Sequence, residues 1–87
     1  MNRNFRVIDK SELEDFDTEC RAYGIDPEEF ELREHDIIET PLNSGIFSYN
    51  AKVTITRKTV SRTYSTGSAT HWVVDFSDDL RAGIFKK

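Results

Sequence analysis

Residues 46–65 read IFSYNAKVTITRKTVSRTYS, and this stretch decides the fold class of the chain. Apolar and aromatic residues alternate there with threonine and serine, which is the period-two pattern of strands with one buried face. Arg57-Lys58-Thr59 interrupts the alternation and predicts the tip of a hairpin. We therefore expect two antiparallel strands with a Val/Ile/Tyr face toward the core and a Thr/Ser face toward solvent.

A helix is predicted before this hairpin, between Ser11 and Gly24. Its apolar stripe has the spacing of a helix and consists of Leu13, Phe16, Cys20 and Tyr23. Ser11 is the expected N-cap, and Glu14 would complete a capping box. Gly24 is expected to adopt the left-handed conformation that ends helices.

The segment between this helix and the hairpin has an ambiguous pattern. Asp26 and Pro27 predict the start of a second helix, at its N-cap and first position. Residues 30–40 fit a helix or a strand, and we favour one or two helical turns followed by a strand. The stretch 41–45 predicts a turn, and residues 4–9 predict a short extended lead.

The C-terminal segment predicts a helix from about His71 to Ala82 that Gly83 ends, with Ile84 and Phe85 packing back after it. Its apolar residues keep a helical rhythm, and Ser68 or Thr70 would cap it. The alternative is a strand over residues 72–76 followed by a shorter helix.

Together these elements predict an α+β fold in which two or three helices pack on one face of a small, three- to four-stranded antiparallel sheet. A length of 87 residues is typical of one domain, so we expect residues 1–87 to form a single domain. The residues expected in the core are Leu13, Phe16, Tyr23, Val53, Ile55, Trp72, Phe76 and Leu80.

The composition excludes several classes of protein. One cysteine, Cys20, cannot form an internal disulfide or a zinc site made of cysteines, and it fits a reducing compartment. The first twenty residues hold no apolar run typical of a signal peptide, and no stretch of about 18 apolar residues could span a bilayer. We therefore expect a cytoplasmic protein with no membrane partner.

The charge of the chain is distributed unevenly. Residues 9–40 hold thirteen acidic side chains against Lys10, Arg21 and Arg33, a net charge of −10, whereas residues 41–87 have a net charge of +4. Ordinary surface helices mix both signs, because opposite charges four residues apart stabilise a helix and like charges destabilise it. The uncompensated charge predicts a surface that attracts cationic partners and repels nucleic acid.

We interpret this charge as a partner-binding surface, in which carboxylates on a helical face replace the phosphates of a nucleic acid in a cationic groove. The expected partner is a basic surface of a nucleic-acid-binding protein or complex, and no direct contact with nucleic acid is expected. The alternative is that the charge serves solubility alone. The candidate partner-binding residues are Asp15, Asp17, Glu19, Glu28, Glu31 and Glu34.

A second candidate site combines basic and aromatic residues near the hairpin tip, a combination that can bind single-stranded nucleic acid. It consists of Tyr49, Arg57, Lys58, Arg62 and Tyr64. The overall charge of −4 opposes this interpretation, and basic residues on exposed strands also protect sheet edges from aggregation, which we favour. Trp72 is expected in the core rather than at an interface.

We expect no catalytic residue, no metal and no cofactor. His35 and His71 lack the spacing of a zinc motif. The pair His35-Asp36 and the stretch 75–79 could contact a cation, but they lack the ligand ladder of a calcium loop. Cys20 lies on an apolar helical stripe, where a buried and unreactive thiol is common. The chain is therefore not expected to be an enzyme.

Two stretches near the C-terminus, 63–67 (TYSTG) and 71–83 (HWVVDFSDDLRAG), are similar to the tails of prophage proteins. In size, acidity and helix-on-sheet pattern the chain resembles small proteins encoded by phages and mobile elements, among them the acidic inhibitors of CRISPR effectors. This resemblance implies a non-catalytic inhibitor, although the positive second half departs from a uniformly DNA-like surface. The alternative is a small regulatory or accessory subunit that docks through an apolar surface, as a monomer or as a homodimer formed through an exposed strand edge.

Overall fold

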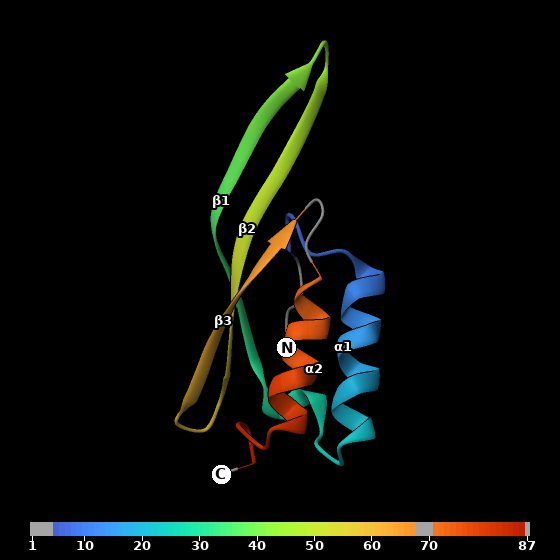
Figure 1. Cartoon of the computed structure of the whole chain (residues 1–87), viewed down its shortest axis with the longest axis vertical. Coiled ribbons are helices and arrows are strands. Elements are labelled where there is room, and N and C mark those ends of the chain that lie inside the picture. Colours follow the sequence, from blue (N-terminus) through green and yellow to red (C-terminus); the bar gives the residue numbers. More distant parts are fainter. Residues whose placement is uncertain (1–4, 68–70, 87) are drawn as a thin grey trace.

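The computed structural model describes residues 5–67 and 71–86 and has the expected α+β class (Figure 1). The elements are α1 (Lys10–Ala22), the 3₁₀ turn η1 (Pro27–Glu29), β1 (Glu31–Asn43), β2 (Ile46–Arg57), β3 (Val60–Gly67) and α2 (Trp72–Arg81). The strands form one antiparallel sheet in the order β1-β2-β3. The two helices lie side by side along one half of the sheet, and the β1–β2 hairpin continues past them.

The two faces of the sheet differ as the alternation predicts. Val53 and Ile55 of β2 and Tyr64 of β3 are buried in the core. Thr54 and Thr63 point to the opposite face, where their hydroxyls are hydrogen-bonded to each other at 2.9 Å. The β2–β3 turn also lies where the sequence predicts it, because β2 ends at residue 57 and β3 begins at residue 60.

The start of α1 differs from the prediction. The N-cap is Asp9 rather than Ser11, and the capping box pairs it with Glu12 rather than Glu14. The Asp9 carboxylate accepts a hydrogen bond from the Glu12 N–H at 2.9 Å, and the Glu12 carboxylate accepts one from the Asp9 N–H at 3.0 Å. Asp9 with Glu12 and Ser11 with Glu14 both have the spacing of a capping box. The earlier frame adds half a turn of helix and places the buried Ile8 at the position that packs against the helix start.

The cap makes α1 sensitive to acid. The N–H of Glu12 and then the hydroxyl of Ser11 lower the pKa of Asp9 below its usual value of 3.8. A depressed pKa contributes stability that is complete above that usual value and is lost as the pH falls through the lower folded value. Asp9→Asn keeps a good cap without titration. We therefore expect acid to destabilise the native protein relative to this variant.

Urea unfolding of both proteins at about pH 6, 4 and 2.5 would measure this difference. The other carboxylates titrate in both proteins, so the difference isolates Asp9. A difference in free energy of unfolding that stays constant across these pH values would contradict the assignment of the cap.

The segment after α1 is mostly strand. Asp26 caps η1 and Pro27 occupies its first position, as predicted, but the helical part is a single 3₁₀ turn. The predicted turn at 41–45 is too long, because Pro41 and Leu42 belong to β1 and Ser44-Gly45 makes the turn. Proline is tolerated here because β1 is an edge strand, where a missing N–H need not break a ladder.

The core is built around aromatic rings. The ring centroid of Phe76 in α2 lies 4.8 Å from Phe16, 5.4 Å from Phe30 and 5.5 Å from Phe85. Of the predicted core, Phe16, Val53, Ile55, Trp72, Phe76 and Leu80 are buried, and Leu13 and Tyr23 are partly buried against it. The predicted core omitted Phe30, which is fully buried. Phe85 is also fully buried and packs back after Gly83 as predicted, and the two rings link the ends of η1 and α2 to the same cluster.

Phe76→Ala tests this packing. The substitution removes the ring that joins the helices to the start of β1, and such a cavity costs about 3–5 kcal/mol. Val74→Ala is the matched control, because Val74 lies two residues away in α2 and is exposed. Urea unfolding should show a large loss of stability for the first variant and less than about 1 kcal/mol for the second. Equal losses would contradict the central place of Phe76.

The predicted C-terminal helix is confirmed within one residue at each end, which excludes the alternative strand over 72–76. Gly83 has φ +78° and reverses the chain, so that Phe85 packs back into the core. His71 is the N-cap but makes no side-chain capping hydrogen bond. Ser68 and Thr70, the predicted caps, lie outside the described residues.

The β1–β2 hairpin extends beyond β3 and beyond the two helices. β3 ends at Gly67, which pairs with Asn50, whereas β1 and β2 continue together to the turn at Ser44-Gly45. We call residues 38–49 of this extension the hairpin arm. It projects from the body as a two-stranded ribbon (Figure 1). The protein therefore measures 47 × 24 × 21 Å, and its radius of gyration is 13.7 Å, against about 12 Å for a compact domain of this length.

Candidate binding surfaces

The six predicted partner-binding carboxylates do not lie on one helical face. Asp15, Asp17 and Glu19 are in α1 and Glu28 is in η1, but Glu31 and Glu34 are in β1. The expectation of a wholly helical acidic surface is therefore wrong for the last two. The physical reason for this error is that apolar and polar residues alternate from Phe30 onward. The chain is therefore extended directly after η1.

Within α1 the three carboxylates also separate. Asp15 and Glu19, four residues apart, lie on the flank that faces α2. Asp17 lies on the other flank, where it lines a depression together with Phe5 and Leu13. Residues two apart on a helix do not face each other, so this division follows from helix geometry.

The flank that faces α2 forms a groove, which we call the α1–α2 groove. Its acidic side consists of Glu12, Asp15 and Glu19, with Thr18, and its other side consists of His71, Val73 and Val74. The volume is about 270 Å³. Val74 is 58% exposed, so a carboxylate rim stands opposite an apolar wall.

Glu34 has a structural role that the sequence did not reveal. Its carboxylate accepts hydrogen bonds from the backbone N–H groups of Arg6, Val7 and Ile8 at 2.7, 2.8 and 2.9 Å. These three donors bend the predicted extended lead across β1. Because its oxygens are engaged inside the fold, Glu34 is not available as a contact for a partner.

Three arginine side chains are paired elsewhere. Arg57 contacts Glu29 at 2.9 Å, Arg62 contacts Asp79 at 3.4 Å, and Arg81 contacts Asp78 at 3.0 Å. None of the ion pairs within residues 5–67 and 71–86 neutralises the acidic side of the α1–α2 groove. The described basic side chains of residues 41–86 therefore form no ion pair with this flank of α1.

The structure does not assemble the second candidate site. Arg57 is largely buried, and its guanidinium donates to the carbonyl of Phe85 as well as to Glu29. Tyr64 is buried and donates to Asp79 at 2.6 Å. Burial, and then this carboxylate, raise the pKa of Tyr64 far above its usual value. Tyr49 lies apart from both, in the hairpin arm.

The open face of the sheet carries a hydrogen-bonded polar row. His35 Nε2 is 2.8 Å from the Thr54 hydroxyl, which in turn contacts Thr63, and His35 Nδ1 is 3.3 Å from Asp36. Within the described part of the chain, no three His, Cys, Asp or Glu side chains are close enough together to hold a metal ion. Cys20 is buried in the core.

Sequence reasoning missed the hairpin arm as a surface. Six large apolar side chains of the described residues are exposed, and five of them belong to the arm: Ile38, Leu42, Ile46, Phe47 and Tyr49. Their exposed fractions range from 41% to 62%. One signal was present in the sequence. The alternating apolar segment before the Lys58-Thr59 turn is longer than the alternating segment after it. The strand after the turn is therefore too short to pair with the whole of β2.

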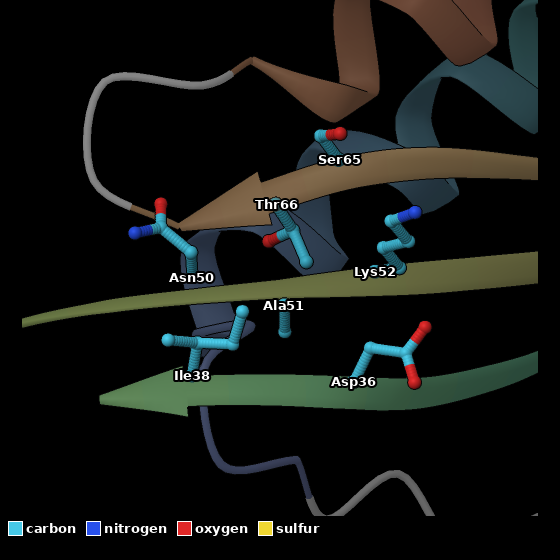
Figure 2. Close-up of a pocket in the computed structure, with 7 residues that line it drawn as sticks. All are labelled: Asp36, Ile38, Asn50, Ala51, Lys52, Ser65 and Thr66. Carbon is cyan, nitrogen blue, oxygen red and sulfur yellow. The ribbon is translucent and has the colours of Figure 1, made fainter. Parts of the chain in front are cut away.

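The base of the arm is hollowed where β3 ends. A shallow groove of about 650 Å³ is lined by Asp36, Ile38, Asn50, Ala51, Lys52, Ser65 and Thr66. In Figure 2 these side chains come from all three strands, with Ile38 and Ala51 next to each other on β1 and β2. The exposed Ile38 of the arm therefore borders this depression, whose other apolar residue is Ala51.

Comparisons with protein-family models, with curated proteins and with solved structures found no match to the chain. No helix in the described part of the structure is both long enough and apolar enough to cross a membrane.

Proposed function

We propose that the chain is a non-catalytic binding protein that uses the α1–α2 groove to occupy a basic surface of a partner protein. The observation that carries the proposal is the pair Asp15 and Glu19. Both line the groove, and neither is neutralised by a described basic side chain. The partner surface would be one that ordinarily handles nucleic acid, so that binding inhibits it.

The chemistry of the groove favours a lysine or arginine side chain of the partner. The aliphatic stem of such a side chain can lie on Val73 and Val74, while its charged end reaches the carboxylates. The net charge of −10 over residues 9–40 would also speed the encounter with a cationic surface. Glu28 and Glu31 are exposed and would add to this long-range attraction.

Of the six predicted partner-binding carboxylates, Asp15 and Glu19 line the groove. Asp17 faces the opposite flank of α1, and Glu34 holds the N-terminal lead. The groove residues are therefore the proposed contacts.

Asp15→Lys tests the proposal, with Glu14→Lys as the matched control. The two residues are exposed neighbours in α1, and the substitutions change the charge equally, but Glu14 lies outside the α1–α2 groove. The probe is a labelled amphipathic peptide of lysine and leucine, followed by fluorescence anisotropy. We expect Asp15→Lys to weaken binding roughly three- to tenfold more than Glu14→Lys does.

Salt dependence provides the second readout. The affinity of the native protein should fall between about 50 and 500 mM NaCl, because salt screens exposed charges. Equal effects of the two substitutions, or affinity indifferent to salt, would contradict the groove as the binding surface. Binding of a labelled single- or double-stranded oligonucleotide would contradict the expected partner class.

A further inference from the structure

We propose that the hairpin arm is a homodimerisation surface, in which the free edge of β2 at residues 46–49 pairs antiparallel with the same edge of a second copy. This inference goes beyond the proposed function and uses no residue of the α1–α2 groove. The dimer is inferred from the exposure of the arm, the free edge of β2, the low charge of the arm and the shape of the chain.

The described residues of one copy do not cover the arm. Among them, its strands pair only with each other beyond Asn50, and an isolated two-stranded ribbon is marginally stable in water. Leu42, Ile46 and Phe47 lie near its end and are 62%, 56% and 45% exposed. Successive side chains of a strand point to opposite faces, so these apolar groups are exposed on both faces of the ribbon. Exposed apolar surface gathered in this way marks a site of association.

The free edge of β2 is the unprotected one. β1 carries Pro41 and two irregularities in its pairing, devices that discourage further strand pairing. Residues 46–49 (IFSY) contain no proline, no glycine and no charge, and their residue types favour strands. The pairing of β3 with this edge of β2 ends at Gly67. A Cβ atom added at Gly67 would lie 2.3 Å from the carbonyl oxygen of Tyr49.

Charge favours a second copy over a different partner. Glu39 is the one charged residue among residues 38–49, so two arms can meet with little repulsion. A basic partner would instead be drawn to the acidic body. Antiparallel pairing also directs the two bodies to opposite ends of the joined arms, which keeps the two acidic segments apart.

Symmetry and size are compatible with this arrangement. An antiparallel strand pairs with its own copy about a two-fold axis, so one edge suffices for a closed dimer. The protein exposes 5678 Å² of surface, roughly 400 Å² more than the approximately 5,300 Å² of a compact monomer of its mass. One half of an assembly is expected to expose more surface than a compact monomer, as this chain does.

Light scattering coupled to size exclusion tests the proposal on the full chain. Between about 1 and 500 µM the native protein should pass from the chain mass of 10.1 kDa to twice that mass. Phe47→Lys and, independently, Ile46→Lys should each weaken dimerisation at least tenfold, because each places a charge on the paired edge. Val74→Lys is the control for dimerisation alone, since Val74 is 58% exposed and lies in α2, in the α1–α2 groove rather than in the arm.

Far-UV circular dichroism should show that all three variants keep the native fold. A native protein that remains monomeric over the whole range would overturn the proposal. Dimers that survive both arm substitutions, or that Val74→Lys disrupts, would also overturn it. These readouts are independent of peptide binding by the groove, so either proposal can fail alone.

Discussion

The packing of Phe76 against Phe16, Phe30 and Phe85 is the contact on which the rest of the structure depends. It joins α1, the start of β1, α2 and the C-terminal reversal in one cluster. These rings pack in one cluster with Val53 and Ile55 of β2 and Tyr64 of β3. The helices therefore lie along that half of the sheet and leave the arm uncovered (Figure 1). The position of the core therefore determines which part of the sheet is left bare.

This arrangement separates two kinds of surface. The body carries Glu12, Asp15 and Glu19 on the flank of α1 that faces α2, and no described basic side chain neutralises this flank. The arm is apolar and almost uncharged. A charged surface makes association with a partner fast and sensitive to salt. An apolar strand edge fixes the geometry in which two strands pair. We infer that the two surfaces serve different contacts, a basic partner at the body and a second copy at the arm.

Local patterns predicted the features that depend on neighbouring residues. The stripe of α1, the turn at Lys58-Thr59 and the stop at Gly83 all follow from spacing within a few residues. The cap of α1 was misplaced because two overlapping frames satisfy the same motif. The role of Glu34 depends on donors more than twenty-five residues earlier in the chain, and the exposure of the arm depends on where β3 ends. Neither is encoded in a local pattern.

Hydrogen exchange of the backbone amides tests most directly the claim that one copy leaves the arm uncovered and a second copy covers it. The account predicts that amides of residues 46–49 exchange more slowly as the protein concentration rises, while those of Val53 and Ile55, buried within the body, do not change. Exchange in residues 46–49 that is independent of concentration would contradict it.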